Sequence, residues 1–232
     1  MYYLGLDIGS SSIKAALVEA ESGKSIGVVQ EPEKEMGMYA HKNGWAEQEP
    51  NHWWLHICNA ITKLKSKYNI SRTQIKGIGI SYQMHGLVLV DKDGKPLRKS
   101  IIWCDSRAVK IGNKAFNDIG EDKCASNLLN SPANFTASKL KWVKDNEPNL
   151  YKNIYKFMLP GDYVAYKFSN TINTTISGLS EGVFWDFKND TIAHFLLEHY
   201  DIEKDLVPEI VDTFGVQSVV DKKGEADSGI AA

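Results

Sequence analysis

The opening stretch of the chain combines residue types that could bind a phosphate group and a metal ion. Two apolar, strand-like runs, residues 2–8 and 13–18, flank a turn of one glycine and three serines. An ionised Asp7 near the end of a buried strand is costly unless a cation or several donors compensate it, and Mg²⁺ prefers carboxylates together with waters and phosphates. Glycine permits a positive φ or a close backbone approach, so the serine amides could form an anion-binding nest. An ordinary hairpin, with its turn capped by the aspartate, is the alternative. The candidate residues are Asp7, Gly9, Ser10, Ser11, Ser12 and Lys14.

A second candidate segment follows a predicted strand at residues 75–81. In α/β sheets, ligands gather beyond the carboxyl ends of the strands. Gln83 and His85 could hydrogen-bond the hydroxyls of a polar ligand there, while Met84 could pack on its carbon face. A histidine satisfied by the backbone is the alternative for His85.

A third candidate segment, beginning at Trp103, follows a predicted strand at residues 96–102. Trp103, Asp105 and Arg107 offer an aromatic wall, an acceptor and a guanidinium within one turn, as a sugar site would use. The alternative is a capped helix start, with Asp105 or Ser106 as the N-cap and Trp103 in the core.

Composition predicts a folded, cytoplasmic protein. The chain has 232 residues, of which 43% are hydrophobic, and this is enough for a substantial core. The net charge of -2 shows no excess of positive charge that would indicate binding to nucleic acid or to a membrane surface. The sequence contains no apolar run of membrane-spanning length and no signal-peptide pattern. The three cysteines have no CxxC spacing, so neither a disulfide framework nor a zinc site is expected; they are Cys58, Cys104 and Cys124.

The predicted elements follow the order β-β-β-α-β, with further helices after it. Turn signals separate a third strand at residues 25–30 from the first hairpin, and residues 32–48 are predicted as a surface loop. Asn51 is a candidate cap for a helix running to about Tyr68. His52 and His56 have the i, i+4 spacing of zinc ligands, but Trp53 stands where a zinc protease needs glutamate, so a surface or packing role is expected. A second hairpin is predicted at residues 87–90 and 97–103, and further helices at residues 106–119, 136–145, 161–168 and 192–200.

Four ordered segments of the chain resemble the FGGY carbohydrate kinases. The segments cover residues 5–14, 44–50 with a following pair of tryptophans, 79–86 and 102–107, and residues 160–163 match a proline-led helix start of the family. Within this family the tetrad at residues 83–86 favours the xylulokinases, since glycerol kinases carry a different one. Around residues 176–182 the chain departs from the usual pattern, with Gly178 and Glu181 where relatives have an Asp and small residues.

The resemblance implies an α/β fold of the RNase H-like, actin and hexokinase type, with a mixed β-sheet flanked by helices. It implies ATP-dependent phosphorylation of a ketose, D-xylulose to D-xylulose 5-phosphate, with ATP and Mg²⁺ as cofactors and a sugar as partner. Asp7 would be the carboxylate on the metal side. The residues that would bind the sugar substrate are Gln83, Met84, His85, Trp103, Asp105 and Arg107.

In this family the catalytic base lies in a second domain that this sequence does not contain. Residues 1–220 are therefore expected to form the N-terminal domain, and residues 221–232 a linker toward a missing C-terminal domain. The sequence leaves a homodimer open. Alternatives are a kinase of ribulose, gluconate or another polyol, a non-catalytic actin-like or Hsp70-like nucleotide-binding lobe, and a sugar-binding module.

Overall fold

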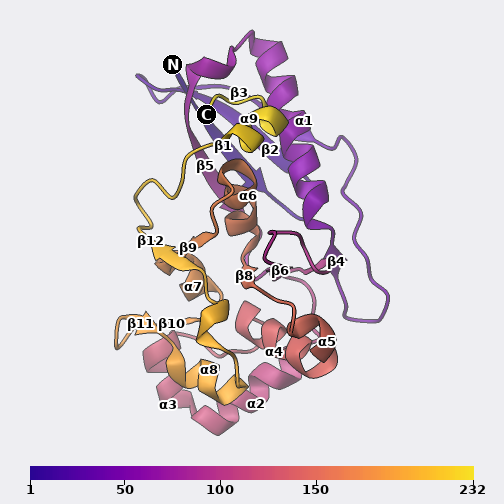
Figure 1. The fold of residues 1–232 in the computed structure, drawn as a ribbon, viewed down its shortest axis with the longest axis vertical. Helices are drawn as coiled ribbons and strands as arrows, with labels where there is room; N and C mark the ends of the chain where they lie inside the picture. Colours follow the sequence, from indigo (N-terminus) through magenta and orange to yellow (C-terminus); the bar gives the residue numbers. More distant parts are fainter.

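A four-stranded mixed sheet forms one end of the protein, and both chain termini lie beside it (Figure 1). The computed structural model describes residues 1–232. The strand order is β3-β2-β1-β5, with β1 (Tyr2–Ile8), β2 (Ile13–Glu19) and β3 (Ser25–Glu31) antiparallel and β5 (Ile75–Tyr82) parallel to β1. The predicted strand arrangement and the α/β fold class are therefore confirmed.

The long helix α1 (Pro50–Tyr68) covers one face of this sheet. Alternate residues of β1 and β2 are fully buried against its apolar stripe, because successive side chains of a strand point to opposite faces. The helix start differs from the predicted cap at Asn51, since Glu49 is the N-cap and Pro50 takes the first helical position. Proline suits that position because its missing N–H would be unpaired there in any case.

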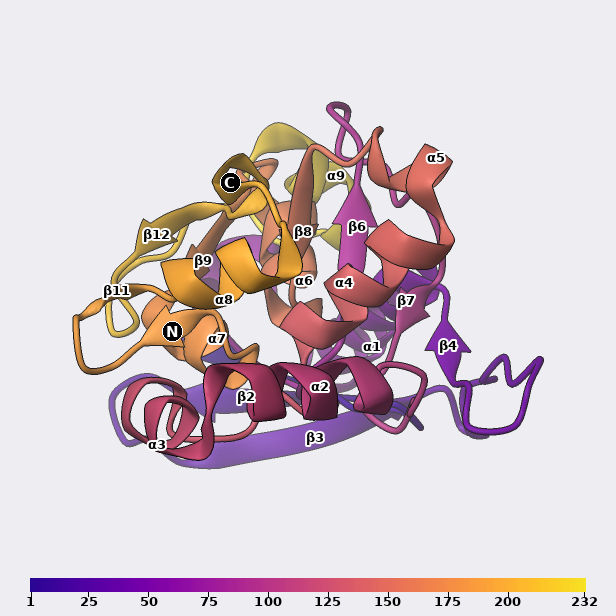
Figure 2. The same cartoon turned by 90° about the horizontal axis from the view of Figure 1, so that it is seen from below.

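A second core lies at the opposite, helical end of the protein. It is built around α2 (Val109–Ile119), α4 (Thr136–Asn146) and α8 (His194–Tyr200), which Figure 2 shows gathered at this end. The rings of Phe157 and Phe184 stack within it, with centroids 4.4 Å apart. No helix of the structure is both long enough and apolar enough to cross a membrane. The shorter elements here are α3 (Glu121–Lys123), a π-helical turn (Cys124–Leu128), α5 (Pro148–Tyr151), α7 (Ile176–Glu181), β9 (Asn173–Thr175), β10 (Trp185–Asp186), β11 (Thr191–Ile192), a 3₁₀ turn (Lys204–Leu206) and β12 (Glu209–Val211).

The second predicted hairpin is only partly formed. Its turn is present, since the Gly94 amide donates to the Asp91 carbonyl at 3.0 Å. However, β6 (Val88–Val90) takes β8 (Lys156–Met158) as its ladder partner. Pro96 has no N–H to continue a regular ladder, and the returning chain pairs with the β6 segment only at isolated bridges, Val90 with Pro96 and Leu87 with Ile101. Its strand β7 (Ser100–Ile101) pairs with β4 (Glu47–Gln48). The predicted surface loop at residues 32–48 therefore ends in a buried strand.

Residues 221–232, predicted as a linker, form a short helix and pack against α1 and the first core. The Asp221 side chain accepts a hydrogen bond from the Gly224 amide at 2.7 Å and caps α9 (Lys222–Ser228). Trp54 of α1 donates to Asp227 at 3.2 Å, and Ile230 is buried in the first core. The seven residues of α9 are mostly polar and show little helical periodicity, so the sequence predicts neither the helix nor its contacts with distant residues.

Helix α6 (Pro160–Ser169) packs closely against the end of β5, so there is little room for a larger residue at this contact. A methyl group at Gly161 would come within 2.1 Å of the Tyr82 ring. We expect Gly161→Ala to lower the free energy of unfolding by about 1–3 kcal/mol, as overpacking does. Urea denaturation monitored by circular dichroism measures the change. Gly79→Ala in β5 is the control, because nothing lies within 4 Å of its added methyl, and an equal loss in both variants would contradict this explanation.

Candidate functional site

The turn at residues 9–12 presents free backbone donors at the end of the first hairpin. The Gly9 amide donates to the Ser12 carbonyl at 3.0 Å and closes the turn, while the amides of Ser10, Ser11 and Ser12 make no hydrogen bond within the chain. Gly9 does not have a positive φ, but a Cβ there would lie only 3.0 Å from the Ser12 carbonyl oxygen. The glycine thus serves a close backbone approach, and three amides remain available for an anion.

Asp7 and Lys14 lie opposite each other beside this turn. They are paired in the β1–β2 ladder, and their Oδ2 and Nζ atoms are 3.9 Å apart. The Asp7 side chain is 56% exposed, so the carboxylate is open to a ligand. No three His, Cys, Asp or Glu side chains cluster into a metal site. The residues fit Mg²⁺ held by a single protein carboxylate, with waters and phosphate oxygens as the other ligands.

The parallel pairing of β1 with β5 brings the second candidate segment to the same edge. Asp7 is the partner of Ser81, and the Gln83 amide donates to the Ile8 carbonyl at 2.8 Å. Met84 is 55% exposed, whereas the Gln83 side chain is buried and points inward. The structure therefore places Met84 at the surface and Gln83 beneath it.

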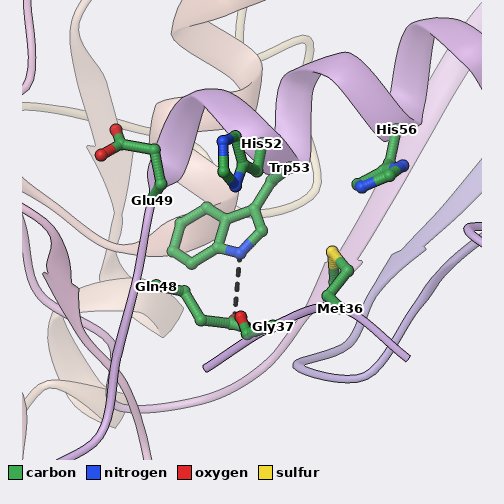
Figure 3. A pocket seen from close by; sticks show the side chains of 7 residues that line it. All are labelled: Met36, Gly37, Gln48, Glu49, His52, Trp53 and His56. Atoms are coloured by element: carbon green, nitrogen blue, oxygen red, sulfur yellow. Dashed lines mark hydrogen bonds between the residues drawn. The ribbon is translucent and has the colours of Figure 1, made fainter. Parts of the chain in front are cut away.

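Gln48, which the sequence did not single out as a site residue, connects the two segments. Its Nε2 donates to the Ser10 carbonyl at 2.6 Å, and its Oε1 accepts from Gln83 Nε2 at 3.2 Å and from Trp53 Nε1 at 3.1 Å. Figure 3 shows the last of these bonds. A glutamine in a polar stretch gives no sequence signal of such a role. The side chain fixes the turn at residues 9–12 relative to Gln83.

We expect Gln48→Leu to lower the free energy of unfolding by about 1–3 kcal/mol, because three buried or partly buried polar groups would lose their partner. Thermal or urea denaturation measures this loss. Gln30→Leu, at a more exposed glutamine of β3, is the control, and stability equal to wild type in the Gln48 variant would show that the connection is not needed.

His52 and His56 line a small pocket behind the turn, shown in Figure 3. The pocket adjoins the turn because the Met36 amide donates to the Ser11 carbonyl at 2.8 Å. His56 Nδ1 lies 3.8 Å from Glu31, and burial lowers the pKa of the ring. The other lining residues are Met36, Gly37, Gln48, Glu49 and Trp53.

His85 is held by its own backbone and by one ring nitrogen. Its φ of 59° is unusual for a residue with a side chain. The amide donates to the Glu181 carboxylate at 3.1 Å, and Lys139 Nζ donates to the His85 carbonyl at 2.6 Å. Burial lowers the pKa of His85, and the neutral ring donates from Nδ1 to the Glu181 carbonyl at 2.9 Å. The Nε2 atom is therefore a free acceptor, and the His85 side chain is partly exposed.

Trp103 joins the third segment to the phosphate turn. Its Nε1 donates to Ser10 Oγ at 3.3 Å, and the side chain is 49% exposed. The alternative that places Trp103 in the core is therefore wrong.

Asp105 and Arg107 lie beneath this tryptophan, where their side chains bind each other. Asp105 is fully buried and accepts from the Ala46 amide at 2.6 Å and from Arg107 Nη2 at 2.6 Å. The Arg107 guanidinium also pairs with Glu47 at 2.7 Å and lies 3.7 Å from the centre of the Trp45 ring. Neither Asp105 nor Ser106 is the cap of α2, which begins after Ala108. A direct contact of either charged side chain with a sugar stays a prediction; the structure shows them supporting the segment.

Three segments with the residue types of a sugar-phosphate site thus meet at one sheet edge. They follow one another along the chain in the order that the sequence shares with the FGGY carbohydrate kinases. A model of the FGGY family of carbohydrate kinases, N-terminal domain, matches residues 2–232. The chain belongs to this family. Among curated FGGY relatives, the xylulose kinase of Staphylococcus xylosus is 32% identical over 90% of this chain and 42% of its own length. The xylulose kinase of Staphylococcus epidermidis (strain ATCC 35984) is 36% identical over 80% of this chain and 36% of its own length.

Solved structures described as xylulose kinases share the fold. A structure described as a xyloylose kinase from Brucella ovis superposes with a TM-score of 0.89 at 28% identity, covering 100% of this chain and 47% of that one. A xylulose kinase from Rhodospirillum rubrum superposes with a TM-score of 0.91 at 24% identity, over 100% of this chain and 47% of its own. The chain spans less than half the length of these relatives, and it corresponds to the N-terminal domain of an FGGY kinase.

Proposed function

We propose that the full-length gene product phosphorylates D-xylulose to D-xylulose 5-phosphate with ATP and Mg²⁺. The observation that carries this proposal is the meeting of an open carboxylate, a turn with free amides and a histidine with a free acceptor nitrogen at one sheet edge. The curated relatives described above are xylulose kinases, and this supports the choice of sugar.

On the phosphate side, Asp7 would hold Mg²⁺, which neutralises phosphate charge when bound. The free amides of Ser10, Ser11 and Ser12 would donate to phosphate oxygens, and Lys14 would add positive charge nearby. Phosphoryl transfer depends mainly on positioning and charge stabilisation, so these groups suit that reaction.

On the sugar side, His85 Nε2 would accept a hydrogen bond from a sugar hydroxyl. Met84 and Trp103 would pack against the carbon atoms of the sugar, since both side chains are about half exposed. Gln83, Asp105 and Arg107 would position these three groups from beneath. Ribulose, gluconate or another polyol is the alternative substrate.

The general base would come from the part of the protein that corresponds to the other half of the relatives. In the chain described here, Asp7 is assigned to the metal, and the Glu181 carboxylate already accepts the His85 amide. Most contacts with the adenosine would also come from that other part.

Isothermal titration of the full-length gene product tests the proposal. D-xylulose is titrated with and without a nonhydrolysable ATP analogue. A kinase binds both compounds, a nucleotide-binding lobe binds only the analogue, and a sugar-binding module binds only the sugar. Binding of the analogue alone, or of the sugar alone, would contradict the proposed function.

A further inference from the structure

His85 is bound at both ends of its main chain by ionisable side chains, the partly buried Glu181 and the fully buried Lys139. The Glu181 carboxylate accepts the His85 amide at 3.1 and 3.2 Å through its two oxygens, and the ammonium of Lys139 donates to the His85 carbonyl at 2.6 Å. Glu181 ends α7 and Lys139 lies in α4, so two separate helices meet at this one residue. Neither contact belongs to a helix or strand ladder.

This arrangement matters because His85 adopts a strained backbone. A positive φ costs a residue with a side chain of order 1 kcal/mol or more and persists only where surrounding contacts hold it. The φ value also decides where the ring points, since the ring follows the Cα–Cβ direction. The ring is further fixed by the Nδ1 bond to the Glu181 carbonyl and by an edge contact with Phe135, at 4.3 Å between centroids.

A buried lysine such as Lys139 is an unusual residue for a hydrogen-bond donor with a purely structural role. Its side chain is fully buried, and the one hydrogen bond that its ammonium makes within the chain is to the His85 carbonyl. A buried lysine is costly unless it is paired and hydrogen-bonded. The free-energy cost of burying Lys139 has a reason if Lys139 and Glu181 together hold His85, which lies between them.

We propose that Glu181 and Lys139 are positioning residues that hold the His85 main chain, and through it the ring, in the orientation that binds the sugar. Neither side chain needs to touch the sugar. The link to sugar binding rests on the proposed function, whereas the hold on the His85 backbone does not.

The charge states of the pair give the proposal a pH signature. Burial raises the pKa of the Glu181 carboxyl to about 7 and lowers the pKa of Lys139 to about 8. Near neutral pH, Glu181 therefore changes between a carboxylate, which accepts the His85 amide strongly, and a neutral acid, which accepts it weakly. The charged or titratable groups around Glu181 are Tyr82, His85, Lys139 and Asp162, and those around Lys139 are Cys104, Asp105, Arg107 and Glu181.

The first test observes the His85 amide directly in the full-length gene product labelled with ¹⁵N-histidine. The His85 resonance is identified by its loss in His85→Gln. We expect its amide proton shift to titrate with a midpoint near pH 7, and we expect this titration to vanish in Glu181→Gln. An amide shift that is flat between pH 6 and 8, or one that titrates equally in the variant, would overturn the proposal.

The second test measures binding by calorimetry at pH 8. We expect Glu181→Gln to raise the Kd for D-xylulose about fivefold, because a neutral acceptor replaces a charged one, and to leave the Kd for a nonhydrolysable ATP analogue within about twofold. Lys139→Met should raise the sugar Kd further. Lys141→Met is the control on the same helix, since Lys141 pairs with Asp145.

Stability measurements separate this role from a structural one. The folded state raises the Glu181 pKa and so binds its proton more tightly than the unfolded state, and this contribution to stability is lost as the pH rises from about 4.5 to about 7. At pH 8 Glu181→Gln is therefore expected to be at least as stable as wild type. Unchanged sugar affinity in this stable variant would overturn the proposal. If wild type binds no sugar but the His85 amide titrates as expected, the proposed function fails and the hold on the backbone stands.

Discussion

Replacing Asp7 with Ala in the full-length gene product is expected to lower kcat for D-xylulose phosphorylation by at least about 10²–10³-fold, the effect typical of losing a group that stabilises transition-state charge. Asp7 is the open carboxylate beside the turn at residues 9–12, and its only charged partner is Lys14. The sugar-side residues lie in other segments, so the Kd for D-xylulose should change little. Steady-state kinetics and calorimetry on the same sample measure both quantities.

Two further variants show whether the charge of Asp7 is responsible. Asp7→Asn keeps the shape of the side chain without its charge and should lose as much activity as the alanine variant. Glu19→Ala removes a carboxylate from the other end of the same strand pair, where Glu19 lies opposite Tyr2, and should leave kcat within about twofold. Loss of sugar affinity with normal turnover at saturation would contradict the metal-side role of Asp7.

The isolated 232-residue chain is expected to show no ATP-dependent sugar phosphorylation. At its candidate site the open carboxylate is Asp7, and Glu181 already binds His85, so no carboxylate is left to take a proton from the sugar. A coupled ADP-release assay with D-xylulose and Mg-ATP measures the activity, with the full-length gene product as the positive control.

A contaminating kinase from the expression host is the main source of a false signal in this assay. The Asp7→Ala variant of the isolated chain, purified in parallel, measures that background. Turnover above this background that rises with the amount of wild-type chain would show that the chain carries its own base.

The first half of the site could be predicted from sequence because its residues are close together in the chain. Asp7, the turn and Lys14 lie within eight positions, and the alternation of residues 2–8 fixes which side chains share a face. The edge shared with Met84 and His85 also follows from sequence, because parallel strands end on the same side of a sheet.

The supporting residues could not be predicted, because their partners are distant in sequence. Gln48 lies 38 residues from Ser10, and Glu181 lies 96 residues from His85. Nothing in the local pattern of either residue indicates its partner. The burial of Asp105 and Arg107 could not be predicted either. Their partners Ala46 and Glu47 are distant in sequence and come from the segment predicted as a surface loop.

The helix at the end of the chain shows a different limit. Its cap at Asp221 is a recognisable signal, but the short polar run after it resembles a linker until the contacts of Asp227 and Ile230 with the first core are seen. Burial of a few residues by distant elements outweighed the local composition.

Phosphorus-31 NMR of the full-length gene product with Mg-ATP and D-xylulose tests whether the protein phosphorylates this sugar. We expect a new phosphomonoester signal, that of D-xylulose 5-phosphate, which grows in step with ADP and is absent without the sugar. An unchanged ATP spectrum with D-xylulose, D-ribulose and gluconate, from a sample whose circular dichroism shows a folded protein, would contradict it.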